Sequence, residues 1–196
     1  MDLWGKELNA ASIGDRKRML WASRLTYQNK HWTGFVMDDV VYVPIGVIRS
    51  PFKTVEGTPI QPVGAKGVRG QVELREEFVA GLKDLEGFSH IILVYHFHLC
   101  KGFDLQVKPF LGGERRGLFA TRAPKRPNPI GFSVVRLVKV EGRFLTIEDV
   151  DILDETPLLD IKPYVPQFDP GETAEIGWLS GRVQGVEKLR ADDRFK

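Results

Sequence analysis

The chain has 196 residues, 42% hydrophobic and 28% charged, and its 28 Lys and Arg against 26 Asp and Glu leave a net charge of only +2. This composition is that of an ordinary globular domain and excludes a strong polycation, and no apolar stretch reaches the roughly 20 residues of a membrane span. The single cysteine, Cys100, excludes an intrachain disulfide, and the first residues lack the order of a secretory signal, so we expect a cytoplasmic protein.

The chain is predicted to have three parts, and most of its strands fall in the middle one. Residues 1–39 read as an N-terminal extension, 40–180 as a strand-rich domain and 181–196 as a C-terminal tail. β-Branched and aromatic residues, alternation and turn signals predict the strands. In chain order these strands are expected at 40–48, 69–75, 88–99, 132–140, 144–152 and 173–179.

The pattern within these segments indicates the fold class. Alternation places Val72 and Leu74 inward, and residues 141–143 form a hairpin signal between two strands. Residues 76–85 read as a short helix with an apolar stripe of Phe78, Leu82 and Leu85. Strands do not alternate regularly with helices, and no glycine-rich dinucleotide motif follows a strand. We therefore predict a mostly β protein, a single-sheet β-barrel-like domain with short helices.

Residues 119–131, FATRAPKRPNPIG, form a proline-stiffened loop. Three prolines exclude a helix interior or a central strand. A rigid loop that presents cations suits recognition of an anion or a nucleotide, although a solvated loop is the plainer alternative. The basic residues on and before this loop are Lys108, Arg115, Arg116, Arg122, Lys125 and Arg126.

A second polar string, residues 151–169, also contains prolines. Asp151, Asp154 and Asp160 fit acid–base chemistry, but Asp154 and Asp160 fit equally well as caps of turns around the prolines. Tyr164, near Lys162, either stacks on a nucleobase or closes the core.

Histidine and cysteine suggest no metal site or nucleophile. His96 and His98 lie two apart on a predicted strand and so share a face, but a third ligand is not obvious, and hydrogen bonding is the favoured role. Cys100 has no His–Asp arrangement to activate it, and Ser133 lacks a GxSxG context.

The order of motifs over residues 44–169 resembles the TsaA-like family, whose best-understood members are TrmO-type tRNA methyltransferases. The matching strings are PIGVIRSPF, TPIQ, LEGFSHIILVYHFH, GLFATRAPKRPNPIGFSVVRL and DILDETPLLDIKPYVPQFD. The resemblance implies a β-barrel that binds S-adenosyl-L-methionine. It also implies a homodimer that methylates N6 of N6-threonylcarbamoyladenosine beside the anticodon of tRNA, without a metal.

The resemblance also implies three groups of site residues. The cofactor would be held by Pro59, Ile60, Gln61, His98, Leu99, Arg122, Phe132, Glu148, Asp149, Val150 and Asp151. Residues that act on the acceptor nucleoside would be Asp154, Asp160, Lys162 and Tyr164, and RNA phosphates would meet Lys108, Arg115, Arg116, Lys125 and Arg126.

This chain departs from the family pattern at four positions. The usual residue is Arg where Ile60 stands, Ser where Ala123 stands, often His where Lys125 stands, and Gly where Glu155 stands. The best-known members also carry a longer C-terminal domain that helps to bind tRNA, whereas only a short segment follows Asp169 here. An alternative function is therefore an S-adenosylmethionine-binding module, or a methyltransferase for a small molecule other than tRNA.

Overall fold

The computed structural model describes residues 40–168 and 175–193. The chain divides into two units, residues 1–41 and 42–196. The N-terminal extension expected over 1–39 lies outside the described residues. Within the described part, no helix has the length and hydrophobicity needed to cross a membrane.

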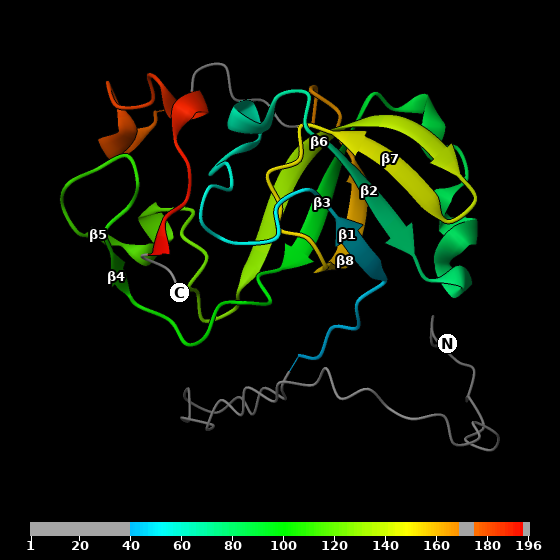
Figure 1. Ribbon diagram of the computed structural model, residues 1–196, viewed down its shortest axis with the longest axis horizontal. Coiled ribbons are helices and arrows are strands. Elements are labelled where there is room, and N and C mark those ends of the chain that lie inside the picture. Colours follow the sequence, from blue (N-terminus) through cyan, green and yellow to red (C-terminus); the bar gives the residue numbers. More distant parts are fainter. Residues whose placement is uncertain (1–39, 169–174, 194–196) are drawn as a thin grey trace, which may run out of the picture. The chain divides into compact units, whose positions relative to one another are not determined.

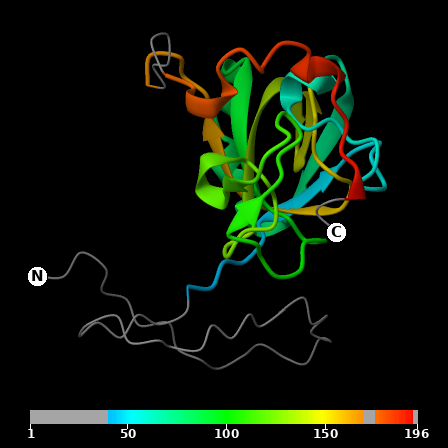
Figure 2. The same ribbon diagram turned by 90° about the vertical axis from the view of Figure 1, so that its left-hand side faces the viewer.

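Six antiparallel strands close into one barrel, which confirms the predicted fold class (Figures 1 and 2). Neighbouring strands follow the order β1-β2-β7-β6-β3-β8, and the pairing of β1 with β8 closes the sheet. Inward positions alternate along each strand and fill the core with residues such as Ile48, Val72, Leu93, Val135 and Leu145. The strands are β1 (Gly46–Arg49), β2 (Arg69–Leu74), β3 (His90–His96), β6 (Ile130–Glu141), β7 (Phe144–Glu148) and β8 (Thr156–Pro163).

The strands predicted at 69–75, 88–99, 132–140 and 144–152 correspond to β2, β3, β6 and β7, whereas one of the two other predictions was wrong in its bounds and one in its structure. β2 and the β6–β7 hairpin lie where they were expected. The strand predicted at 40–48 begins only at Gly46, where the chain first pairs with β2 and β8. Of the strand predicted at 173–179, the described residues 175–179 contain the 3-10 helix η5 (Gly177–Leu179), and Gly177 has a φ of 54° that an extended strand cannot accommodate.

β8 was not predicted, because its prolines argue against a central strand. Pro157 pairs only with β1, since the pairing of β8 with β3 begins at Leu158. Pro163 pairs only with β3, because β1 has ended by then. Each proline therefore lies where β8 has a single neighbour and needs no second ladder bond.

The helix predicted at 76–85 is two short 3-10 helices, η2 (Glu76–Leu82) and η3 (Leu85–Gly87). Asp84, with a φ of 67°, separates them. Phe78 is not in the core but exposed, with Arg75 over its ring, so the predicted stripe holds only for the other two residues.

A small lobe stands apart from the barrel sheet, where β4 (Gln106–Val107) pairs with β5 (Arg116–Gly117) (Figure 1). It has its own core of Val107, Leu118 and Ala123. The remaining 3-10 helices are η1 (Pro62–Ala65), η4 (Leu118–Ala120) and η6 (Val186–Lys188).

Candidate functional site

Arg122 of the proline loop joins two other residues predicted to hold the cofactor. Its Nη1 donates a 2.9 Å hydrogen bond to Gln61 Oε1, and its guanidinium lies 5.1 Å from the centre of the Phe132 ring. Gln61 comes from the loop before η1 and Phe132 from the outer face of β6, where it is 55% exposed. The loop before η1 and the proline loop with the strand that follows it are far apart in the sequence, and they meet at one cation.

A buried hydrogen-bonded chain contains a fourth predicted residue, Asp151. Ser133 Oγ donates to Asp151 Oδ1 at 2.7 Å, and Tyr95 Oη lies 3.1 Å from Ser133 Oγ. Because the serine proton goes to the carboxylate, the tyrosine hydroxyl donates to the serine. Gly131 leaves room for this arrangement, since a Cβ there would overlap the rings of Tyr95 and Phe97.

The environment of Asp151 favours the neutral carboxylic acid more than water does. Burial raises the pKa of Asp151 from 3.8 to about 6, although the Ser133 hydrogen bond and the positive charge of Arg122 oppose the shift. Burial, and next the charge of Asp151, raise the pKa of Tyr95 as well, so Tyr95 remains a hydrogen-bond donor. A carboxyl that titrates near neutrality beside an arginine is typical of a functional site.

Glu148, also predicted to hold the cofactor, contacts two arginines other than Arg122. Glu148 is buried in the middle of a row across three strands, with Arg69 on β2 and Arg136 on β6. Both arginines hydrogen-bond its carboxylate, which lowers the pKa of Glu148. Asp149 has a φ of 68° and accepts the Gly67 N–H at 2.7 Å.

The other residues predicted to hold the cofactor lie on the loops or in the core. Val150 is fully buried, Leu99 is 52% exposed and Ile60 is half-buried. Pro59 is buried and bridges to Arg190, and His98 Nδ1 lies 3.5 Å from Thr156 Oγ1. Burial, and next the nearby His96, lower the pKa of His98, so the neutral ring is favoured.

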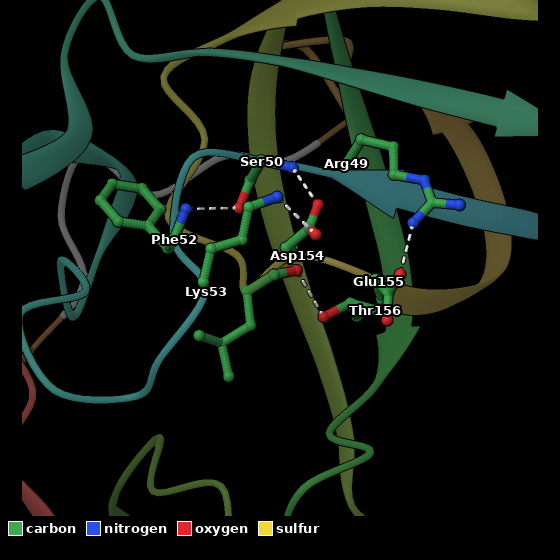
Figure 3. Close-up of polar contacts among 8 residues, drawn as sticks. Arg49, Ser50, Phe52, Lys53, Asp154, Glu155 and Thr156 are labelled. Carbon is green, nitrogen blue, oxygen red and sulfur yellow. Dashed lines mark hydrogen bonds and ion pairs between the residues drawn. The ribbon is translucent and has the colours of Figure 1, made fainter.

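Asp154 braces the turn before β8 (Figure 3). Its carboxylate accepts the Ser50 N–H at 3.0 Å and pairs with Lys53 Nζ at 2.6 Å. Burial would raise the pKa of Asp154, but these hydrogen bonds keep it below its usual range. The neighbouring Glu155 has a φ of 61°, a conformation that suits the glycine of the family pattern, and pairs with Arg49 at 2.9 Å.

An open hollow of about 470 Å³ lies beside this turn. Arg49, Lys53 and Arg69 line it, but each of these cations is paired with a carboxylate, of Glu155, Asp154 and Glu148 respectively. The hollow is therefore not the strongly positive site that its lining suggests.

The four residues predicted to act on the acceptor do not form one cluster. Asp154 precedes β8 and Tyr164 follows it, so the whole strand, about 23 Å long at about 3.3 Å per residue, lies between them. Asp160 and Lys162 point outward along the strand and pair with each other at 2.7 Å. Tyr164 packs edge-on against His90.

The cations predicted to hold RNA are partly engaged by the protein itself. Arg115 donates to Gln106 O, and Arg116 pairs with Glu114 and lies over Trp178. Arg126 donates to two backbone carbonyls. Lys108 is exposed and Lys125 half-buried.

Sequence reasoning missed three residues that shape the site. Ser133 was considered only as a nucleophile, and Tyr95 only as part of an apolar run, yet both belong to the Asp151 chain. Trp178 Nε1 donates to Ala120 O at 2.8 Å and so fastens the loop that carries Arg122. Ser133 could have been found from its inward position on an alternating strand, but no local signal linked Trp178 to a loop 58 residues earlier.

In the part of the chain that the structure describes, histidine and acidic side chains do not assemble into a metal site. Among the described residues, no group of three or more His, Cys, Asp or Glu side chains could hold an ion.

Residues 47–170 match the tRNA-methyltransferase O N-terminal domain family. The chain belongs to this family. It is 59% identical over 156 residues to a probable S-adenosyl-L-methionine-binding protein of Pyrococcus abyssi, over 80% of this chain and 85% of the relative. A mouse protein named tRNA (adenine(37)-N6)-methyltransferase is 36% identical over 68% of this chain and 32% of its own length.

A crystal structure of TrmO from Pseudomonas aeruginosa has the same fold, with a TM-score of 0.62 and 42% identity. The match covers 71% of this chain and 62% of the crystallised chain. The family member described here therefore spans less than two thirds of that relative's length, and only about a third of the mouse protein's.

Proposed function

We propose that this chain is an S-adenosyl-L-methionine-dependent methyltransferase that methylates N6 of adenosine in tRNA. The finer proposal is that the acceptor is N6-threonylcarbamoyladenosine beside the anticodon, and that the enzyme works in the cytoplasm as a homodimer. Membership of the family and the names of the relatives support the reaction class.

The observation that carries the proposal is the meeting of Gln61, Arg122 and Phe132, with Asp151 within the electrostatic reach of Arg122. Bound S-adenosylmethionine would supply an electrophilic methyl group. The donor set fits this molecule: a guanidinium for its carboxylate, a carboxyl for its positive charge and an exposed aromatic face for its adenine. Ser133 and Tyr95 orient the Asp151 carboxyl, and Gln61 orients the guanidinium.

The outer face of β6 and β3 supports the dimer. Beyond Phe132, which the cofactor would use, Val134 faces outward beside Ile92 of the neighbouring strand, and Ile130 on the same strand as Val134 is 39% exposed. An apolar strip of this kind is suited to contact with a second copy. The roles of Asp160, Lys162 and Tyr164 stay predictions, to be tested by turnover with both ligands bound.

Two measurements test the proposal. Nucleoside mass spectrometry after incubation with S-adenosylmethionine and tRNA, with and without threonylcarbamoyl modification, should show a methyl group only on the modified adenosine. Arg122→Ala should weaken cofactor binding by about 1.5–3 kcal/mol, roughly tenfold to 150-fold, because a charge-assisted contact is lost.

Arg143→Ala is the matched control, since Arg143 also lies 5.1 Å from an aromatic ring, that of Phe144, and belongs to the distant hairpin. Cofactor binding without methyl transfer to any tRNA would favour the alternative of a binding module or a small-molecule methyltransferase. If neither the cofactor nor its demethylated product binds, the proposal fails.

A further inference from the structure

Phe119 is a large aromatic residue that the fold displays in solvent. Its side chain is 76% exposed, although burying a phenylalanine normally contributes about 1.5–3 kcal/mol. Nothing in the proposed cofactor site uses it. The exposed ring of Phe119 is therefore available for contact with a ligand or a partner.

The backbone on both sides of Phe119 is fixed. Leu118 before it is 1% exposed and belongs to the small core of the lobe. Ala120 after it accepts the Trp178 indole N–H, and Thr121 donates from both its backbone and its hydroxyl to Leu118 O. The ring is thus presented by an anchored turn.

A guanidinium is held against the same ring. Arg126 lies 5.8 Å from the centre of Phe119. Its Nη1 donates to Thr121 O at 3.0 Å and to Ala123 O at 3.2 Å, and these carbonyls, which carry no net charge, are its polar partners in the described part of the chain. The positive charge of Arg126 therefore stays available beside the aromatic face, in contrast to that of Arg116, which pairs with Glu114.

The ring also lies close to the proposed reaction site. Phe119 precedes Arg122 by three residues, so their Cα atoms are at most about 11 Å apart. A nucleic acid whose acceptor base reaches a cofactor held by Arg122 would therefore lie near the turn that carries Phe119.

We propose that Phe119 and Arg126 form a stacking platform for an unpaired nucleobase of the RNA substrate, close to the base that receives the methyl group. An aromatic face beside a cation is how proteins hold single-stranded bases, and stacking tolerates any base. This inference rests on the proposed function for its substrate class. The competing occupant of an exposed aromatic ring is a second copy of this chain, which the test separates.

The experiment compares Phe119→Ala, Phe119→Tyr and the control Phe88→Ala, whose ring is also exposed and lies at the opposite end of the barrel, just before β3 begins. Affinity is measured for an anticodon stem–loop RNA and for the same RNA with an abasic residue at each loop position in turn. Phe119→Ala should bind about tenfold more weakly, about 1.4 kcal/mol. Phe119→Tyr and Phe88→Ala should stay within about twofold, and affinity for S-adenosylmethionine should not change in any variant.

One abasic position should reproduce the loss in the wild type and add nothing further in Phe119→Ala. Unchanged RNA affinity in Phe119→Ala overturns the inference. So does a change of oligomeric state in sedimentation without a change in RNA affinity, which would assign the ring to contact between copies. If the wild type binds the RNA through Phe119 but transfers no methyl group, the proposed function fails while the platform stands. If the protein methylates tRNA equally well with and without the Phe119 ring, the proposed function stands and the platform fails. If it binds no RNA, the proposed function and the platform both fail.

Discussion

Asp151→Asn should make the protein more stable at neutral pH. The folded chain raises the pKa of this carboxyl from 3.8 to about 6, so between about pH 4 and pH 6 the folded state holds a proton that the unfolded state has released. Stability therefore falls as pH rises through this window. The two pKa values differ by about 2.2, and one pKa unit corresponds to about 1.36 kcal/mol. Above pH 6 the ionised Asp151 therefore lowers the free energy of unfolding by about 3 kcal/mol.

Asparagine carries no charge and can still accept the Ser133 hydrogen bond, so the variant escapes this cost. Allowing about 1 kcal/mol for a weaker hydrogen bond, we expect Asp151→Asn to be about 1–3 kcal/mol more stable than the wild type at pH 8. The two proteins should converge near pH 4.

Urea unfolding at several pH values measures this difference, with Asp160→Asn, on the outer face of β8, as the control. Wild-type and Asp151→Asn curves that run parallel from pH 4 to pH 8 would refute the reasoning. Asp151→Asn should also bind the cofactor more weakly, because a substitution that stabilises the fold at a functional residue commonly reduces function.

Two other substitutions test how the site is built. Trp178→Phe removes the hydrogen bond to Ala120 O but keeps an aromatic ring near Arg116. Cofactor affinity measured by calorimetry should therefore fall about twofold to fivefold. An unchanged affinity would show that the C-terminal segment does not position the proline loop. Glu155→Gly should be about 1 kcal/mol more stable than Glu155→Ala in thermal unfolding, because both lose the Arg49 pair but only glycine relaxes at a φ of 61°. Equal stabilities would show that this turn stores no strain.

The sequence predicted the barrel because its strands carry local signals. Alternation identified β2, and the turn at 141–143 identified the hairpin of β6 and β7. β8 carries no such signal: its two prolines are tolerated only because β1 and β3 each cover a different half of the strand, which is a property of the closed sheet. A prediction made one segment at a time cannot include that tertiary arrangement.

The candidate site divides in the same way. Resemblance selected Gln61, Arg122, Phe132 and Asp151. The structure brings the first three into contact and places Asp151 within the electrostatic reach of Arg122. The residues proposed for the acceptor were chosen because they share one string of sequence. An extended strand separates its own ends by several ångströms per residue, so closeness in that string does not mean closeness in space.

The C-terminal segment ties the two cofactor loops to each other, although sequence reasoning divided it between the end of the domain and a tail. Trp178 holds the proline loop at Ala120, and Ala191 exchanges backbone hydrogen bonds with Gly57 and Thr58 just before Gln61. Arg122 and Gln61, the two partners of the central hydrogen bond, thus belong to loops that one segment fastens at separate points. Loops fixed at both sides lose less conformational freedom when a ligand binds, and this lowers the cost of binding. The segment after residue 174 is therefore part of the framework of the proposed binding site.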